Sequence, residues 1–316
     1  FSSPRLPYHA SRLRNPMLAN LEARPDPGPN RKPLLRALAM AMVLPPIAIV
    51  LLGPTSAQGQ ESSRLFPSRA LLPQVLAGPR EPVTSAALMG VFRNPNQHGN
   101  GVEAEVSLAA AFPIYLLFGT PDRNPVVLGL EAAAYARFGL QVLERELVAT
   151  DWIFAVPIVW HHENGWIRFR YFHSSSHMGD EYARRFQDPG LNVSRDAAEV
   201  FFFRELVPTV GAWAAARYSY NVLPEGDRQW GLRAGFQLES PHDPRSFSPF
   251  LATDVEWDQQ AGMRPRVEAR FGAWLPRMDG MRRIRASLVV LSGPSPLGQF
   301  RFRSATQIGI SLQGNL

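Results

Sequence analysis

Hydrophobic and polar residues alternate one by one in many short stretches between residue 84 and the end of the 316-residue chain. In "WGLRAGFQL" (230–238) every second residue is Trp, Leu, Ala or Phe, and the positions between hold Gly, Arg and Gln. A period of two residues is typical of β-strands with one apolar face. The pattern predicts an all-β protein of about twelve strands, over residues 84–93, 101–112, 126–138, 149–161, 166–174, 198–206, 210–221, 228–238, 247–258, 263–275, 283–292 and 304–315.

Three features favour an antiparallel transmembrane β-barrel over a soluble sandwich. The polar positions combine Arg, Glu and Asp with Gly, which suits a polar lumen. Strands of roughly 9–13 residues are long enough to cross a bilayer when tilted. Tryptophans lie at or near the predicted strand ends, where an interfacial aromatic girdle would place them: Trp152, Trp160, Trp166, Trp213, Trp230, Trp257 and Trp274. An even strand number also agrees with bacterial single-chain barrels.

Residues 31–57 have the layout of a secretory signal peptide. Basic residues at 31, 32 and 36 precede an apolar run over 37–53, and "TSA" (55–57) offers small residues for cleavage before Gln58. The alternative is a membrane anchor, but the run of about 17 residues is short for a span and contains Pro45 and Pro46. We expect a leader with a cleaved signal peptide over 1–57.

The remaining chain then divides into two parts. Residues 58–83 hold four prolines before the first alternating stretch. We expect them to form an extended periplasmic segment that partly fills the lumen, and residues 84–316 to form the barrel. This organisation predicts export to a bacterial outer membrane, with outer-membrane lipid and the barrel-assembly machinery as partners.

The charge of the chain argues against a nucleic-acid partner. The formal net charge is +6, but residues 1–57 hold seven basic and two acidic residues, and the remainder holds 26 basic and 25 acidic residues. The expected mature chain is therefore nearly neutral, without the basic surplus that nucleic-acid binding needs. Because the sequence has no cysteine, disulfides and thiolate metal sites are excluded.

The stretch "RFRYFHSSSHMGDEY" (168–182) changes from strand-like alternation to a cluster of polar residues. Arg168 and Arg170 must face the lumen, because an Arg in lipid costs about 2–4 kcal/mol at the bilayer midplane. His173 and Ser175 then share the lipid-facing side. Strands of odd number run outward from a periplasmic N-terminus, which places this pair near the external rim.

A histidine and a serine two residues apart on one face can form a base-activated nucleophile. The two Cα atoms are separated by roughly 6.6 Å along a strand, and an imidazole leaning along the strand can reach the hydroxyl. Such a pair needs a third group to orient the imidazole. The sequence offers Asp180, Glu181 and Asn192 for this role.

Other interpretations of the cluster remain open. The residues can be the polar end of a strand that enters water, followed by a long loop over about 175–197. His177, Asp180 and Glu181 are also chemically able to hold a metal ion, although their spacing matches no recognised ligand pattern. A third possibility is a loop that binds a polar head group or a partner.

The His173-x-Ser175 pair resembles the site of two groups of lipid-hydrolysing outer-membrane barrels, outer-membrane phospholipase A and the lipid A deacylases. The phospholipase resemblance implies twelve strands and calcium as a cofactor, and otherwise no cofactor is expected. The Asn that follows the serine in those groups is Ser176 here. The longer string "HSSSHMGDEY" (173–182), with "PREP" (79–82) and "TDW" (150–152), resembles an uncharacterised outer-membrane barrel family with a Ser-Ser-His-x-Gly-Asp-Glu signature.

Together these observations predict an outer-membrane β-barrel with a structural, small-solute or binding role. The alternative is a lipid acyl hydrolase of the surface leaflet that uses His173 and Ser175. A hydrolase requires the two side chains together on the outer wall, whereas a pore requires an open lumen lined by residues such as Arg168 and Arg233.

Overall fold

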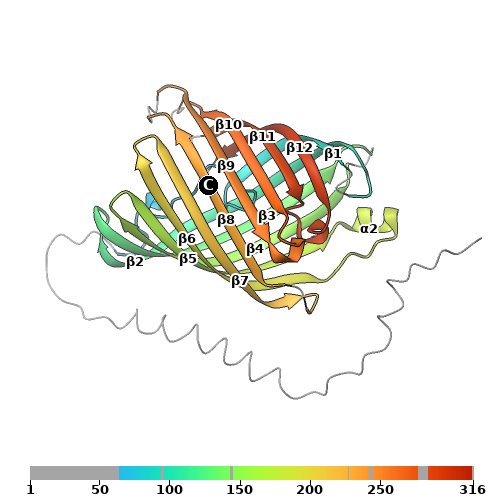
Figure 1. Cartoon of the computed structure of the whole chain (residues 1–316), viewed down its shortest axis with the longest axis horizontal. Helices are drawn as coiled ribbons and strands as arrows, with labels where there is room; N and C mark the ends of the chain where they lie inside the picture. The colour runs from blue at the N-terminus through green and yellow to red at the C-terminus, as the bar shows by residue number, and fades with distance from the viewer. Residues whose placement is uncertain are drawn as a thin grey trace, which may run out of the picture. The chain divides into compact units, whose positions relative to one another are not determined.

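The computed structural model describes residues 64–93, 96–142, 145–226, 228–241, 245–276 and 284–314. Within them, twelve antiparallel strands form one closed barrel in which chain neighbours pair and β1 pairs with β12 (Figure 1). The predicted fold class and strand number are confirmed. The expected leader over 1–57 and the start of the N-terminal segment, 58–63, lie outside the described residues.

The strands follow the alternating stretches closely. Their bounds are β1 (Thr84–Phe92), β2 (Gly101–Thr120), β3 (Arg123–Gly139), β4 (Leu147–His162), β5 (Gly165–Met178), β6 (Val193–Val207), β7 (Val210–Leu223), β8 (Trp230–Glu239), β9 (Ser248–Asp258), β10 (Pro265–Trp274), β11 (Ile284–Pro294) and β12 (Ser304–Gly314). Short helical elements are η1 (Arg69–Leu71), α2 (Asp180–Phe186), η2 (Gln259–Ala261) and η3 (Gly298–Phe300). None of the helices in the described ranges has the length and apolar character needed to cross a membrane.

The polar cluster lies in a strand, contrary to the expected loop over 175–197. Positions 174–177 continue the regular ladder between β4 and β5, as far as the pair Ala149↔Met178. The connection to β6 is therefore shorter and contains α2. The polarity of these residues suggested a loop, but backbone pairing with two neighbouring strands keeps them extended.

The two ends of the barrel differ. The connections β2–β3, β4–β5 and β6–β7 are two residues long, at 121–122, 163–164 and 208–209. The opposite end has the connection with α2 and the one with η3. Outer-membrane barrels have short periplasmic turns and longer external loops, so the end with α2 corresponds to the expected external side.

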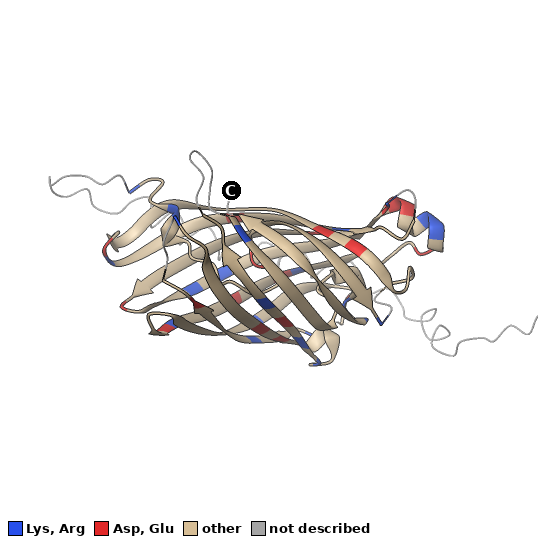
Figure 2. Ribbon diagram, turned by 90° about the horizontal axis from the view of Figure 1, so that it is seen from above, with Lys and Arg blue, Asp and Glu red and all other residues tan. Residues whose placement is uncertain are grey.

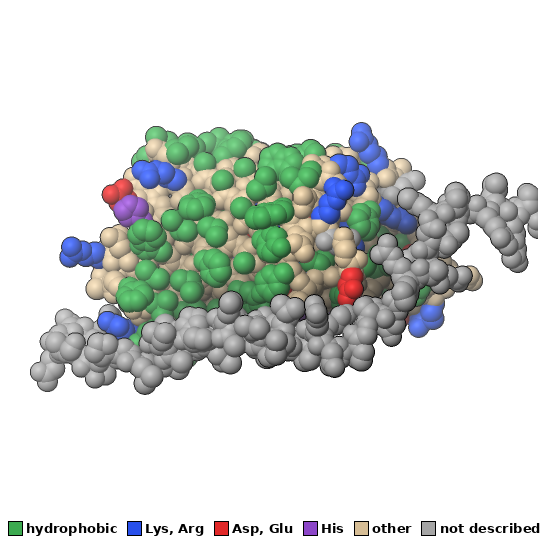
Figure 3. All heavy atoms as spheres, turned by 60° about the horizontal axis from the view of Figure 1, so that its bottom comes forward, with side chains coloured by type: hydrophobic (Ala, Val, Ile, Leu, Met, Phe, Trp, Pro, Cys, Tyr) green, Lys and Arg blue, Asp and Glu red, His purple; other side chains and the backbone are tan. Residues whose placement is uncertain are grey.

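The outer wall is hydrophobic, as the alternation predicts. Leu232 and Phe236 of β8 are 46% and 41% exposed. Figure 3 shows a band of hydrophobic side chains across one face of the wall, with charged side chains gathered towards its two ends. Trp152, Trp160 and Trp230 are exposed on this wall. Trp166 and Trp213 are buried in the lumen, and Trp274 packs against the same core, so the predicted girdle is wrong for these three.

Charged residues of both signs occur along the strands of the barrel (Figure 2), and many of them are buried. The arginines expected to point inward form ion pairs in the lumen. Arg170 Nη2 lies 3.0 Å from Glu199 Oε1, and Arg270 Nε lies 2.5 Å from Glu268 Oε1. The inward assignment of these positions is therefore confirmed.

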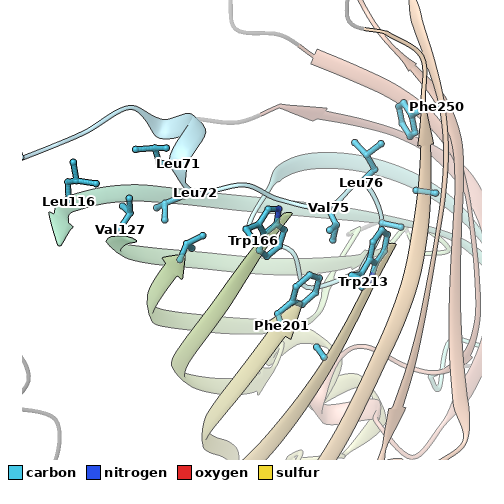
Figure 4. Close-up of a cluster of buried hydrophobic side chains, with 14 residues drawn as sticks. Leu71, Leu72, Val75, Leu76, Leu116, Val127, Trp166, Phe201, Trp213 and Phe250 are labelled. Atoms are coloured by element: carbon cyan, nitrogen blue, oxygen red, sulfur yellow. The ribbon is translucent and has the colours of Figure 1, made fainter. Parts of the chain in front are cut away.

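Residues 71–83 run through the lumen before the chain enters β1. Leu71, Leu72, Val75 and Leu76 are buried against side chains of the barrel wall, among them Trp166, Phe201, Trp213 and Phe250 (Figure 4). Each fully buried Leu or Val contributes roughly 1.5–3 kcal/mol through removal of apolar surface from water. The segment therefore fills part of the lumen with a hydrophobic core.

Polar contacts fix the same segment on its other side. Gly78 N–H donates to Glu268 Oε1 at 2.9 Å, and Glu81 Oε1 lies 2.6 Å from Arg233 Nη1. Gly78 has a φ of +128°, and a Cβ at this position would collide with the Arg233 guanidinium. Burial raises the pKa of Glu81, but Arg168 and Arg233 lower it more, so the net pKa is about 2. Glu81 is therefore an ionised anchor within the lumen.

Candidate functional site on the lipid-facing wall

The serine run of β5 is divided between the two faces of the barrel wall. Ser176 is buried and its Oγ accepts a hydrogen bond from Gln299 N at 3.1 Å. Ser174 lines a cavity in the lumen. His173 belongs to the opposite, outward-facing set of positions, with a side chain that is 50% exposed. By strand alternation the Ser175 side chain shares this outward face, although the lumenal cavity also reaches this residue.

His173 contacts a carboxylate of the neighbouring strand. Its Nδ1 lies 2.8 Å from Asp196 Oδ1, because His173 and Asp196 are direct cross-strand partners in the β5–β6 ladder. The Asp196 side chain is 19% exposed. An ionised Asp196 requires a proton on Nδ1, which leaves Nε2 available as a base.

Asp196 is in turn held by Asn221 of β7. Asn221 Nδ2 donates to Asp196 Oδ2 at 2.9 Å. The β6–β7 register shifts between the pairs Ser194↔Leu223 and Asp196↔Tyr220, and Asn221 in this irregular stretch has a φ of +49°. Asn tolerates this conformation better than most residues, and bulges commonly re-aim side chains. The irregularity thus brings an amide onto the outward-facing carboxylate.

Ser175 lies next to this chain of contacts. Its cross-strand partners are Trp152 on β4 and Ser194 on β6. Within the described ranges, no hydrogen bond joins Ser175 to His173. Catalytic hydrogen bonds are often long before substrate binds, so this geometry is compatible with a serine and its base.

Aromatic residues surround the group on the outward face. Trp152 is 43% exposed and Tyr218 is 40% exposed. The Tyr171 and Tyr220 rings lie 6.2 Å apart, and Tyr220 is the cross-strand partner of Asp196. Such aromatic residues favour the interface between hydrocarbon and head groups. The polar group therefore lies beside aromatic side chains of the outer wall.

The residues first considered as orienting groups lie elsewhere. Asp180 and Glu181 begin α2 and are exposed, and Glu181 Oε1 lies 3.4 Å from Arg184 Nη2. Asn192 is exposed before β6. Asp196 and Asn221, which the sequence reasoning missed, occupy the positions beside the imidazole. The acidic residue in "RDA" (195–197) could have indicated this role, because alternation along the strand places its side chain on the outward face.

The structure does not gather His177, Asp180 and Glu181 into a metal site. Across the described residues, no three His, Asp or Glu side chains are close enough to hold a metal ion. Asp196, the carboxylate beside His173, is already engaged by His173 and Asn221. The calcium suggested by the resemblance therefore has no donor set of this kind here.

The closed twelve-stranded barrel with a hydrophobic outer wall is of the outer-membrane type. The chain belongs to the family described as "Protein of unknown function (DUF1207)", whose profile matches residues 55–315. No curated protein matches the sequence.

Among the solved structures that resemble the fold are two of outer membrane phospholipase. One is the outer membrane phospholipase dimer of Salmonella typhi with bound calcium, with a TM-score of 0.53 and 14% identity over 74% of this chain and 90% of that chain. The other is an active-site mutant of outer membrane phospholipase A from Escherichia coli, with a TM-score of 0.53 and 14% identity over 85% and 96% of the two chains. The likeness shows a common fold and supports an outer-membrane location.

Proposed function

We propose that this barrel hydrolyses acyl esters of membrane lipids at its lipid-facing wall, with Ser175 as nucleophile and His173 as general base. The observation that carries the proposal is the 2.8 Å contact between His173 Nδ1 and Asp196 Oδ1 on an outward face. An ionisable pair that faces lipid is costly and commonly functional. The similarity of the fold to outer membrane phospholipase A supports the same activity.

The reaction follows from the roles of the three side chains. His173 Nε2 takes the proton of Ser175 Oγ as this oxygen attacks the ester carbonyl carbon. The bond to the alcohol oxygen then breaks, and the imidazolium returns its proton to the leaving alcohol. A water molecule, deprotonated by the same Nε2, releases the fatty acid and restores Ser175. Asp196 stabilises the transient imidazolium, and Asn221 holds Asp196.

The position of the group indicates a lipid substrate. Soluble esters do not need a site on the outer wall of a barrel, whereas the ester linkages of a leaflet lie at the depth of an aromatic interface. Phospholipid and the acyl esters of lipid A are the two substrates of this kind in an outer leaflet. A small-solute pore is less favoured, because residues 71–76 pack within the lumen.

The test measures fatty acid released by the purified barrel in detergent from phosphatidylethanolamine and from lipid A, with and without calcium. Ser175→Ala and His173→Ala are expected to abolish release. Asp196→Asn should lower it by roughly 10²–10⁴-fold, because an orienting, charge-stabilising partner of the base is lost.

Ser174→Ala is the matched control, since Ser174 is the adjacent serine on the lumenal face. It should retain activity, and all four variants should retain the heat-modifiable gel mobility of a folded barrel. Absence of release by the wild type from both lipids, or full activity of Ser175→Ala, would refute the proposal.

A further inference from the structure

A polar cavity of about 90 Å³ lies in the lumen beyond the N-terminal segment. Pro79 and Arg80 form part of one side, and Gly298 and Arg301 of the η3 connection form part of another. The remaining lining comes from strands β4 to β10. The His173 side chain lies on the opposite face of the wall, and the cavity also contacts Ser175 of the same strand.

The lining of this cavity has more cations than anions. Seven arginines and four acidic residues line it among the described residues. Two of the arginines have further carboxylate partners away from the cavity: Arg170 contacts Glu131, and Arg233 contacts Asp254. Arg80 pairs with Asp151. Part of the surplus is carried by the arginines around Glu256 and Asp258.

Three guanidinium groups share two carboxylates there. Asp258 Oδ2 lies 3.2 Å from Arg195 Nη1 and 2.6 Å from Arg217 Nη2. Glu256 contacts Arg217, at 2.9 Å, and Arg266. This cluster has one more positive than negative charge. An unbalanced charge is costly in the low dielectric of a buried site.

Several buried guanidinium nitrogens of the lining also lack partners. The Nε atoms of Arg170, Arg217 and Arg266 make no hydrogen bond to any described residue. Buried polar groups are nearly always hydrogen-bonded, and an exception requires an explanation. An anion held by the arginines would balance the charge and give donors of this cluster an acceptor.

The cavity has room for one such group. One water molecule needs roughly 10–15 Å³ of such space, so the cavity can hold several waters or one tetrahedral oxyanion. Ser174, whose position faces the lumen, also lines the cavity and adds a hydroxyl donor. Arginine forks match the oxygens of phosphate groups in particular.

We propose that this cavity binds a phosphate group, coordinated by Arg195, Arg217 and Arg266. The group is supplied either by inorganic phosphate or by a glycerophosphate head group freed from its acyl chains. The cavity also contacts Ser175, but the proposal does not rest on the hydrolase activity, because the three arginines hold the phosphate whether or not Ser175 is a nucleophile.

The experiment is calorimetric titration of the intact purified barrel with inorganic phosphate and, separately, with glycerol 3-phosphate at low ionic strength. One phosphate should bind per barrel. Arg195→Gln and Arg266→Gln should each weaken phosphate binding at least tenfold. Neither change leaves a carboxylate unpaired, because Asp258 and Glu256 both keep Arg217 as a partner. Tighter binding of glycerol 3-phosphate identifies the head group as the source, and equal binding identifies free phosphate.

Arg264→Gln is the matched control, because the Arg264 side chain does not line the cavity; it donates to Phe302 O, Ser304 Oγ and the backbone oxygen of Ala261. It should bind phosphate like the wild type. In the wild type, sulfate should compete with phosphate, and chloride at the same ionic strength should not. Absence of binding by the wild type, equal competition by chloride, or unchanged affinity in both cavity variants would overturn the proposal.

Discussion

Replacing Glu81 by Gln should loosen the segment that fills the lumen. Glu81 Oε1 lies 2.6 Å from Arg233 Nη1 and 3.4 Å from Arg168 Nη2. Removing one partner of a buried ion pair costs about 3–5 kcal/mol when the other charge is left alone. Here Arg233 keeps Asp254 at 2.5 Å, and Arg168 has Glu199 at 3.7 Å.

We therefore expect a smaller loss, of about 2 kcal/mol, for the packed state of the segment. Since every 1.4 kcal/mol corresponds to a tenfold change in an equilibrium constant, the opened population should rise about 30-fold. The change is local, because the strand ladders of the barrel do not involve the Glu81 side chain.

The absence of native cysteine allows a direct assay. Val75 is 1% exposed within the lumen, so Val75→Cys introduces a single protected thiol of similar volume. The rate of its modification by a maleimide linked to polyethylene glycol reports opening of the segment. In the Val75→Cys background, Glu81→Gln should raise this rate about 30-fold.

Glu205→Gln provides the control, because Glu205 is exposed near the end of β6. It should leave the rate unchanged. A change of less than threefold for Glu81→Gln, in a barrel with normal heat-modifiable mobility, would refute the anchoring role of this carboxylate.

Three other predictions follow from the assigned faces and charges. Leu232→Arg should impair assembly, measured as loss of heat-modifiable mobility, since an outward Arg costs about 2–4 kcal/mol in lipid. Gln237→Arg should leave assembly intact but speed modification of Cys at position 75, because Gln237 Oε1 accepts from Leu76 N at 3.2 Å. Glu81 has a folded pKa of about 2 against an ordinary 4.5, so its stabilising effect is complete above pH 4.5 and is lost as the pH falls towards 2. Tryptophan fluorescence of the wild type should change over this pH range as the segment loosens, and the Glu81→Gln variant should lack the part of the change that is due to Glu81.

The side chains that occupy the lumen differ from those that an open channel requires. Residues 71–76 form a hydrophobic core with the wall, and the charged residues beyond them form ion pairs. This arrangement separates two polar regions, the cavity near Arg195 inside and the group around His173 outside. Each region has its own test, so the two proposals can fail independently.

Alternation along the chain determined the strands and their faces. A barrel strand contacts lipid on one side and a polar lumen on the other, so apolar and polar side chains alternate along it. Arg168 and Arg170 were placed inward on this basis, and both form lumenal ion pairs. Trp166 alternates in step with these arginines and is also inside. The girdle prediction was wrong for it because it relied on the residue type and ignored the face of the strand on which the residue lies.

The partners of these residues were decided only by tertiary structure. Parity gives the face of a residue but not the register between strands, so the sequence did not pair His173 with Asp196, 23 positions later. The Asn221 contact depends further on a local irregularity in β7. Residues 71–83 have no alternating pattern, and their place in the lumen follows from contacts with side chains contributed by many strands, which no local stretch of sequence encodes.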